Sequence, residues 1–111
     1  MPRMRIDRVK TISVENLREF IKATGGRWFG MKYKKYSYAT YPPSMNLSIR
    51  NCRIGVSKGV KGLQPNRKQI DLENGNITLW DRKRDNFRSF KLVNIAGITY
   101  KNILYVVNAS V

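Results

Sequence analysis

The spacing of apolar residues along the chain changes once, from a helical period near the N-terminus to a strand-like alternation over the rest. Residues 13–26 carry the helical pattern in four apolar side chains, Val14, Leu17, Phe20 and Ile21. Ser13 is a favoured N-cap residue, and Gly25 and Gly26 can adopt the positive φ angles of a helix C-terminus. A helix of about eleven residues is not stable alone in water, so we expect its apolar stripe to pack on a sheet.

The alternating pattern begins in residues 27–38, whose core-facing side chains are expected to be Phe29, Met31 and Tyr33. Two prolines at 42 and 43 then interrupt it, because proline cannot donate a hydrogen bond inside a sheet. The next strand is expected over residues 45–50, with a half-buried face made by Met45, Leu47 and Ile49. Cys52 continues the apolar series out of phase, which predicts a β-bulge near residues 51–52.

The rest of the chain is expected to form further strands and turns. Residues 3–12 mix basic and apolar side chains as an edge strand does, and residues 58–68 are expected to form a loop. Asn74-Gly75 favours a hairpin turn between strands at 70–72 and 77–79. A charged turn at 82–86 is expected to precede strands at 87–95 and 98–107, the last folded back around residues 101–102.

Short turns between strands favour antiparallel pairing, because parallel strands need long crossover connections. The sequence therefore predicts an α+β fold in which one short N-terminal helix packs on a strongly bent, mainly antiparallel sheet or small open barrel of five to six strands. Residues 1–111 are long enough for one hydrophobic core and are expected to form a single domain.

The net charge of the chain indicates which class of partner it binds. The chain has 22 Lys and Arg against seven Asp and Glu, a formal net charge of +15. Such an excess repels itself in a folded domain, so it indicates a polyanionic partner, with DNA or RNA as the first candidate. Apolar runs are too short to cross a bilayer, and residues 1–10 lack the apolar region of a signal peptide. We therefore expect no membrane association and a cytoplasmic or nucleoid-associated protein.

Catalytic chemistry is not indicated. The chain has no histidine and one cysteine, Cys52, which is expected to be a packing residue. Each of the seven carboxylates has a structural interpretation; Asp71 and Asp81, for example, are expected on the solvent side of strands. We accordingly expect a protein that is not an enzyme and that has no metal site and no cofactor.

Basic and aromatic residues are interleaved most densely in residues 27–38, which hold four basic side chains and five aromatic rings. Cations pair with phosphates while aromatic rings stack on bases. Further cations occur in the 58–68 loop and around the charged turn. The candidate nucleic-acid-binding residues are Arg27, Trp28, Lys32, Lys34, Lys35, Tyr36, Tyr38, Lys58, Lys61, Arg67, Lys68, Arg82, Lys83, Arg84 and Arg88.

Two functions are compatible with these features. The first is nucleic-acid binding, mainly through phosphate contacts with aromatic stacking and with low sequence specificity. The alternative is a protein-binding module or inhibitor that docks its basic face on an acidic partner, such as a nucleic-acid-processing enzyme. A homodimer is also compatible with the sequence, because residues 103–107 carry little charge to deter strand pairing at a sheet edge.

Overall fold

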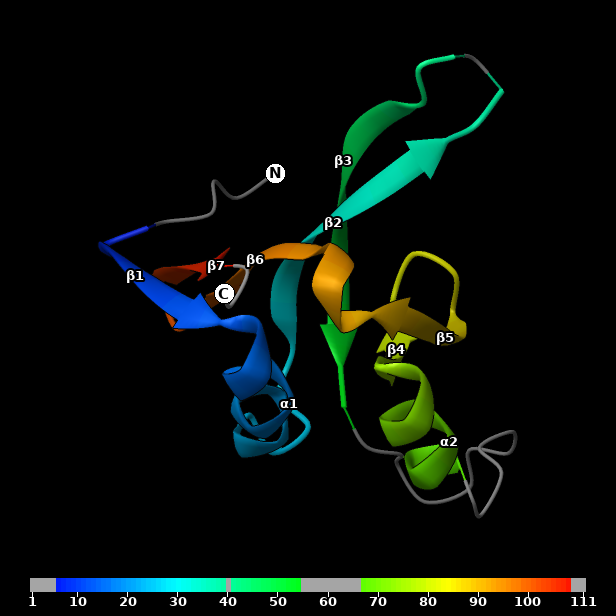
Figure 1. The fold of residues 1–111 in the computed structure, drawn as a ribbon. Helices are drawn as coiled ribbons and strands as arrows, with labels where there is room; N and C mark the ends of the chain where they lie inside the picture. The colour runs from blue at the N-terminus through cyan, green and yellow to red at the C-terminus, as the bar shows by residue number, and fades with distance from the viewer. Residues whose placement is uncertain (1–5, 40, 55–66, 109–111) are drawn as a thin grey trace.

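The computed structural model describes residues 6–39, 41–54 and 67–108. Within these ranges the elements, in chain order, are β1 (Arg8–Ser13), α1 (Val14–Ala23), β2 (Phe29–Ser37), β3 (Ser44–Arg53), α2 (Arg67–Asn74), β4 (Asn76–Asp81), β5 (Asn86–Lys91), the 3-10 turn η1 (Leu92–Asn94), β6 (Ile95–Tyr100) and β7 (Ile103–Asn108). Figure 1 shows these elements, and in it the β2–β3 hairpin extends away from the helices.

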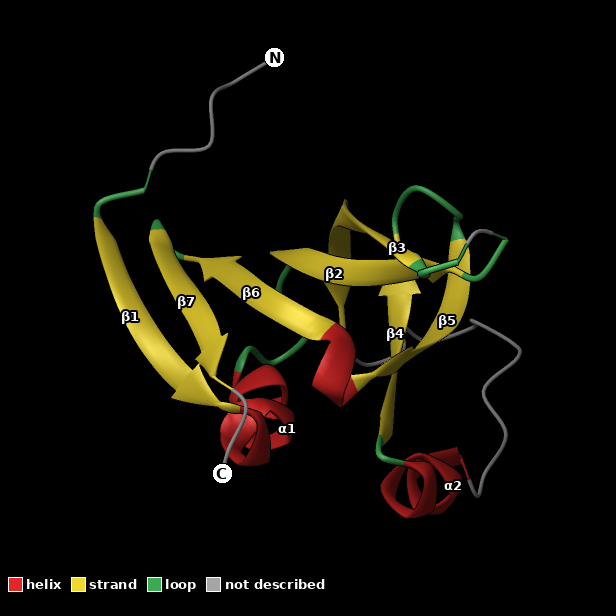
Figure 2. Ribbon diagram, turned by 45° about the horizontal axis from the view of Figure 1, so that its top comes forward, coloured by secondary structure: helices red, strands yellow, loops and turns green. Residues whose placement is uncertain are grey.

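The strands form one seven-stranded sheet in the order β1-β7-β6-β2-β3-β4-β5. Every neighbouring pair is antiparallel except β1 and β7, which run parallel. The sheet is curved but not closed, and both helices lie on the same side of it (Figure 2). The predicted α+β class with a mainly antiparallel sheet is confirmed, with seven strands instead of five or six and with a second helix.

Helix α1 agrees with the sequence pattern. Ser13 occupies the N-cap position in an extended conformation, and Gly25 and Gly26 follow the helix with φ of 64° and 85°. Leu17 and Ile21 are fully buried. The short helix is therefore stabilised by its packing on the sheet rather than by its own hydrogen bonds.

Strand β1 forms one edge of the sheet, as expected for a strand rich in charge. It covers β7, with Arg8 beside Ile103 and Ser13 beside Asn108. The strand at 103–107 is consequently not an edge, and the argument that its low charge leaves an edge open for dimerisation was wrong. The structural edges are β1 and β5.

The predicted hairpin around Asn74-Gly75 is wrong, because residues 67–74 form helix α2. Gly75, at φ 67°, ends this helix, and its backbone N–H donates a hydrogen bond to the Leu72 carbonyl. Strand β4 starts directly afterwards at Asn76. A positive-φ glycine ends a helix as readily as it turns a hairpin. Residues 67–68, expected in a loop, belong to this helix.

Strand β3 turns its side chains the opposite way from the prediction. Met45, Leu47 and Ile49 are exposed by 46%, 54% and 66%, whereas Arg50 and Cys52 are buried. The β2–β3 ladder pairs without interruption from Phe29–Cys52 to Ser37–Ser44, so the expected bulge at 51–52 is absent from it. An irregularity lies instead between β2 and β6, at Lys32 and Tyr33.

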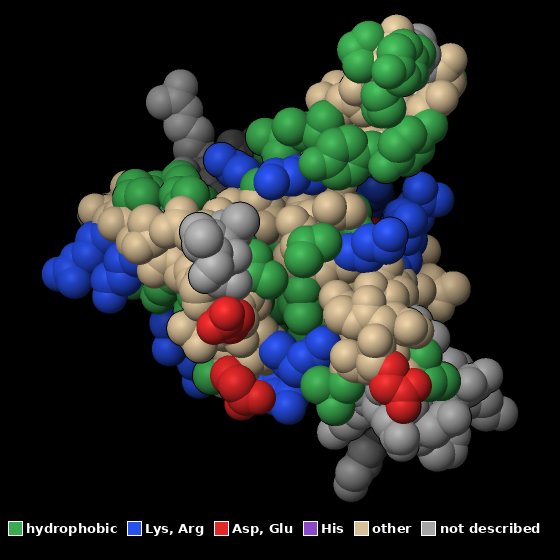
Figure 3. Space-filling view, in the orientation of Figure 1, with side chains coloured by type: hydrophobic (Ala, Val, Ile, Leu, Met, Phe, Trp, Pro, Cys, Tyr) green, Lys and Arg blue, Asp and Glu red, His purple; other side chains and the backbone are tan. Residues whose placement is uncertain are grey.

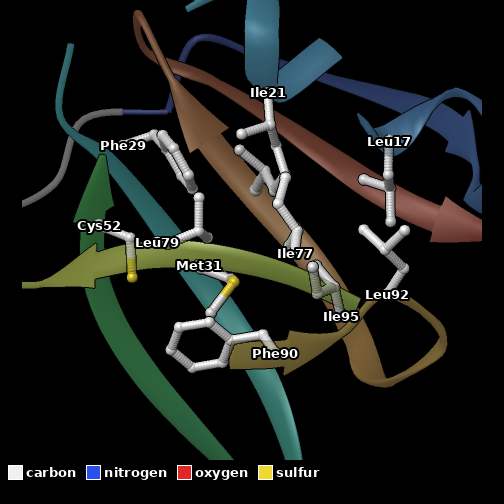
Figure 4. Packing of buried hydrophobic residues seen from close by; sticks show 11 residues of the cluster. Leu17, Ile21, Phe29, Met31, Cys52, Ile77, Leu79, Phe90, Leu92 and Ile95 are labelled. Carbon is white, nitrogen blue, oxygen red and sulfur yellow. The ribbon is translucent and has the colours of Figure 1, made fainter. Parts of the chain in front are cut away.

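The hydrophobic core lies between the sheet and α1 and extends under the β4–β5 hairpin. Figure 4 shows Phe29, Met31 and Cys52 of β2 and β3 together with Leu79 and Phe90 of β4 and β5. Ile21 and Leu17 enter the same cluster from α1. The core thus joins α1, β2 and β3 to the β4–β5 hairpin.

Two carboxylates that were expected in solvent are buried. Asp71 is 5% exposed in α2, and Asp81 is fully buried at the end of β4. The guanidinium Nη1 of Arg50 lies 3.9 Å from Oδ2 of Asp81. The pair occurs where β3 and β4 join through only two residue pairs, Cys52–Asp81 and Arg53–Trp80. Neither Nη1 of Arg50 nor Oδ2 of Asp81 has a hydrogen-bond partner among the described residues, so the opposite charge of Asp81 is what offsets the burial of Arg50.

This ion pair generates a stability prediction. Asp81→Leu leaves Arg50 buried without its partner, and should lower the free energy of unfolding by about 3–5 kcal/mol. Arg50→Met combined with Asp81→Leu replaces both charges with apolar groups, and should restore most of that loss. Urea denaturation of the three proteins measures this. A double variant as unstable as Asp81→Leu would contradict the assignment.

Candidate nucleic-acid interface

The outward side of the β2–β3 hairpin brings two kinds of side chain together. We call it the hairpin face and define it by Lys32, Lys34 and Tyr36 of β2 and Ile49, Leu47 and Met45 of β3. These residues are direct cross-strand partners: Lys32 with Ile49, Lys34 with Leu47, and Tyr36 with Met45. Because side chains alternate along a strand, burial of Phe29, Met31 and Cys52 on one side places this set on the other.

Aromatic rings continue the hairpin face toward the tip of the hairpin. The rings of Tyr36 and Tyr38 stack with centroids 6.5 Å apart and planes 26° from parallel. Tyr38 is 77% exposed, and Tyr41 in the connection is almost completely exposed. Figure 3 shows hydrophobic side chains gathered along this projecting hairpin, with Lys and Arg side chains close to where it joins the body. Isolated exposed apolar residues are ordinary, whereas a gathered set indicates a binding surface.

Trp28 lies at the base of the hairpin, directly before β2, and it is flanked by two arginines. The guanidinium carbon of Arg53 is 5.0 Å from the ring centroid of Trp28, and that of Arg82 is 5.7 Å away. Cation–π contacts of this length hold guanidinium groups in place. Within the described ranges neither arginine forms an ion pair with a carboxylate. Trp28 therefore orients two arginines that have no carboxylate partner among the described residues.

Lys32 is partly buried because the aliphatic part of its side chain lies beside Gly97. Gly97 of β6 is its register partner on the side away from β3. A Cβ placed on Gly97 would lie 3.9 Å from Cδ of Lys32 and 3.3 Å from the Tyr105 carbonyl oxygen. The missing side chain leaves room for the aliphatic part of the lysine to lie along the sheet.

The charged turn between β4 and β5 is confirmed. Arg82, Lys83 and Arg84 are exposed there. The Lys83 backbone N–H donates a hydrogen bond to Oδ1 of Asp81, at 3.1 Å, and Asp85 closes the turn at φ 50°. The turn is thus tied to the same carboxylate that pairs with Arg50. Arg82 belongs both to the turn and to the Trp28 cluster.

The other candidate residues are dispersed. Arg88 pairs with Leu79 on the core side of the β4–β5 hairpin, and its guanidinium carbon lies 5.9 Å from the Phe90 ring centroid. Lys35 is exposed on the side of β2 opposite the hairpin face, and Arg27 is exposed before the strand. Lys58 and Lys61 lie outside the described residues, and for Arg67 and Lys68 only the backbone, in α2, is described.

The cations do not form one patch in the view of Figure 3. Lys and Arg side chains occur there in several separate groups, and acidic side chains lie mainly near the two helices. The sequence did not indicate Arg53 as a site residue, and it placed Met45, Leu47 and Ile49 on the half-buried side of their strand instead of the exposed one. Continuing the alternation outward from a buried Cys52 is the signal that assigns all four to the outer side.

Two observations concern the groups that could take part in metal binding or nucleophilic chemistry in the part of the chain that the structure describes. No three of its His, Cys, Asp and Glu residues lie close enough to hold a metal ion. Burial, followed by the nearby Asp81 carboxylate, raises the pKa of the Cys52 thiol from 9.0 to about 12. A thiol that stays protonated is a poor nucleophile, which agrees with a packing role. None of the described helices is long and apolar enough to span a bilayer.

Comparison with protein-family models, with curated proteins and with solved structures gave no match to this chain.

Cys52 supplies a prediction about reactivity. Its burial and raised pKa should protect it from a maleimide at pH 8 in the folded protein. Addition of urea should give complete labelling within minutes, because the exposed thiol ionises near pH 9.0. Mass spectrometry of the two reactions provides the readout. Comparable labelling with and without urea would show that Cys52 is not enclosed in the core.

Proposed function

We propose that this chain is a small, non-enzymatic nucleic-acid-binding protein that contacts phosphates with its basic side chains and bases with its exposed aromatic rings. The observation that carries the proposal is the shared position of Lys32, Lys34 and Tyr36 on one exposed side of β2. The net charge of +15 provides the long-range attraction that such binding needs. Location in the cytoplasm or on the nucleoid belongs to the same proposal.

Each part of the surface has a chemical role in this proposal. Ammonium groups of Lys32 and Lys34 neutralise phosphates as point charges, whereas the Arg53 and Arg82 guanidiniums offer paired donors. Tyr36 and Tyr38 offer ring faces, and stacking on a ring contributes about 1–3 kcal/mol per base. Neither type of contact distinguishes one base from another strongly, so the proposal includes low sequence specificity.

A second candidate function is supported by the exposed row of Met45, Leu47 and Ile49. Apolar side chains bordered by cations also suit an acidic protein, such as an enzyme that processes nucleic acids. Nuclease treatment of the immobilised protein with its bound partners distinguishes the two functions. A partner that is retained on the immobilised protein after nuclease treatment supports protein binding, and loss of every partner supports nucleic-acid binding.

Salt dependence tests the primary proposal. Each phosphate neutralised on a single strand contributes about −0.7 to the slope of log K against log salt concentration. We expect Arg82→Gln, Lys83→Gln and Arg84→Gln together to flatten that slope by about 2 and to weaken binding to unrelated sequences alike. Fluorescence anisotropy between about 50 and 200 mM salt gives the slopes.

The matched control removes the same charge elsewhere. Arg8, Lys10 and Lys101 are exposed around β1 and the β6–β7 turn, at the opposite end of the strand order from β5. Changing all three to Gln should leave the slope close to that of the wild type. Equal slopes for both triple variants would mean that only total charge matters. Absence of binding at low salt would reject the proposed function.

A further inference from the structure

The hairpin face is divided lengthwise into two rows of different chemistry. Lys32 and Lys34 follow one another on β2, and Ile49 and Leu47 stand directly opposite them on β3. Side chains on one side of a strand are spaced by two residues, about 6.6 Å, and neighbouring strands are about 4.8 Å apart. A cationic row and an apolar row therefore run in parallel, about 4.8 Å apart.

This division fits a single strand of nucleic acid better than a duplex. A duplex presents phosphates to a flat surface and hides the faces of its bases in the stack. Docking it on the hairpin face would bring phosphates against Leu47 and Ile49, and charged groups lose hydration beside apolar side chains without gaining a partner. A single strand exposes both components, with phosphates on one side and the faces of unstacked bases on the other.

The spacing of the lysines agrees with the same ligand. About 6.6 Å between Lys32 and Lys34 is close to twice the rise of about 3.4 Å per stacked nucleotide. The two ammonium groups can therefore reach alternate phosphates of a stacked strand or successive phosphates of an extended one. Beyond them, the stacked rings of Tyr36 and Tyr38 continue the surface toward the hairpin tip.

We propose that the hairpin face binds single-stranded nucleic acid in one orientation, with phosphates along Lys32 and Lys34 and with bases over Met45, Leu47 and Ile49. Arg53 and Arg82 hold a further phosphate at the Trp28 end. The inference rests on the proposed function and deepens it, because it specifies strandedness and the side of the face that each part of the ligand contacts. A second copy of the chain is a poor occupant, since two molecules of charge +15 repel each other.

Four probes of equal length test the ligand: a single-stranded oligothymidylate, an oligouridylate, a DNA duplex, and a single-stranded DNA backbone whose internal sites are abasic. We expect at least tenfold tighter binding of the base-bearing single strands than of the duplex or the abasic strand. The abasic probe keeps the phosphates and removes the bases, so it isolates the contribution of the apolar row. The two base-bearing probes differ in the 2′-hydroxyl and in the thymine methyl group, so equal affinities would show that neither group matters.

Two double variants then measure the contribution of each row to binding. Leu47→Ser with Ile49→Ser should weaken binding of the base-bearing strands about tenfold, leaving the salt slope and the abasic strand unaffected. Lys32→Gln with Lys34→Gln should weaken binding of base-bearing and abasic strands alike and reduce the salt slope by about 1.4. The matched control is Leu72→Ser with Val93→Ser, because these residues are exposed by 60% and 64% outside the hairpin. Thermal unfolding verifies that each variant is folded.

The outcomes distinguish failure of this inference from failure of the proposed function. Equal affinity for duplex and single strands, or an abasic strand that binds as well as oligothymidylate, overturns the inference and leaves nucleic-acid binding intact. No binding of any probe at low salt overturns both. A wild-type dimer that Leu47→Ser with Ile49→Ser dissociates, without any change in oligonucleotide affinity, overturns the inference by assigning the face to a second copy.

Discussion

Burial of Arg50 beside Asp81, together with that of Cys52 beside Phe29, fixes which way β3 turns, and the proposed interface depends on that direction. Alternate side chains of a strand point to opposite sides of its sheet, so a side chain fixed in the core fixes all the others. With Arg50 and Cys52 inward, Ile49, Leu47 and Met45 are outward. The apolar row is thus exposed because Arg50, with its counter-ion Asp81, and Cys52 occupy the core side of the strand.

The same constraint assembles the cationic side of the interface. The uninterrupted ladder between β2 and β3 places Lys32 and Lys34 opposite the exposed apolar row. Asp81 accepts a hydrogen bond from the Lys83 N–H, so it also anchors the turn that brings Arg82 to Trp28. The Asp81 carboxylate therefore contacts a core residue, Arg50, and the backbone of the charged turn. These contacts supplement the two residue pairs that join β3 to β4.

The sequence predicted the elements whose hydrophobic pattern fits a single secondary structure. It missed the elements whose structure depends on packing against other parts of the fold. Helix α1, the alternation of β2, the charged turn and the fold-back at residues 101–102 all follow from patterns that have one interpretation. Asn74-Gly75 suits a hairpin and a helix end equally, and only packing of α2 beside β4 decides between them. The side of β2 carrying Lys32, Lys34 and Tyr36 was predictable. Arg53 and the apolar row were missed, because the sequence favoured Met45, Leu47 and Ile49 over Arg50 as core residues and reconciled them with a buried Cys52 through a bulge that the β2–β3 ladder does not contain.

The most direct test of this account is a methyl NMR titration of the protein with a single-stranded oligonucleotide. Met45, Leu47 and Ile49 carry methyl groups on the hairpin face, whereas Leu72 and Val93 carry exposed methyl groups elsewhere. We expect the methyl resonances of Met45, Leu47 and Ile49 to shift until the protein is saturated with the oligonucleotide, while those of Leu72 and Val93 stay unchanged. Shifts confined to Leu72, Val93 or the methyl groups of β1, with the hairpin face unaffected, would contradict the central claim.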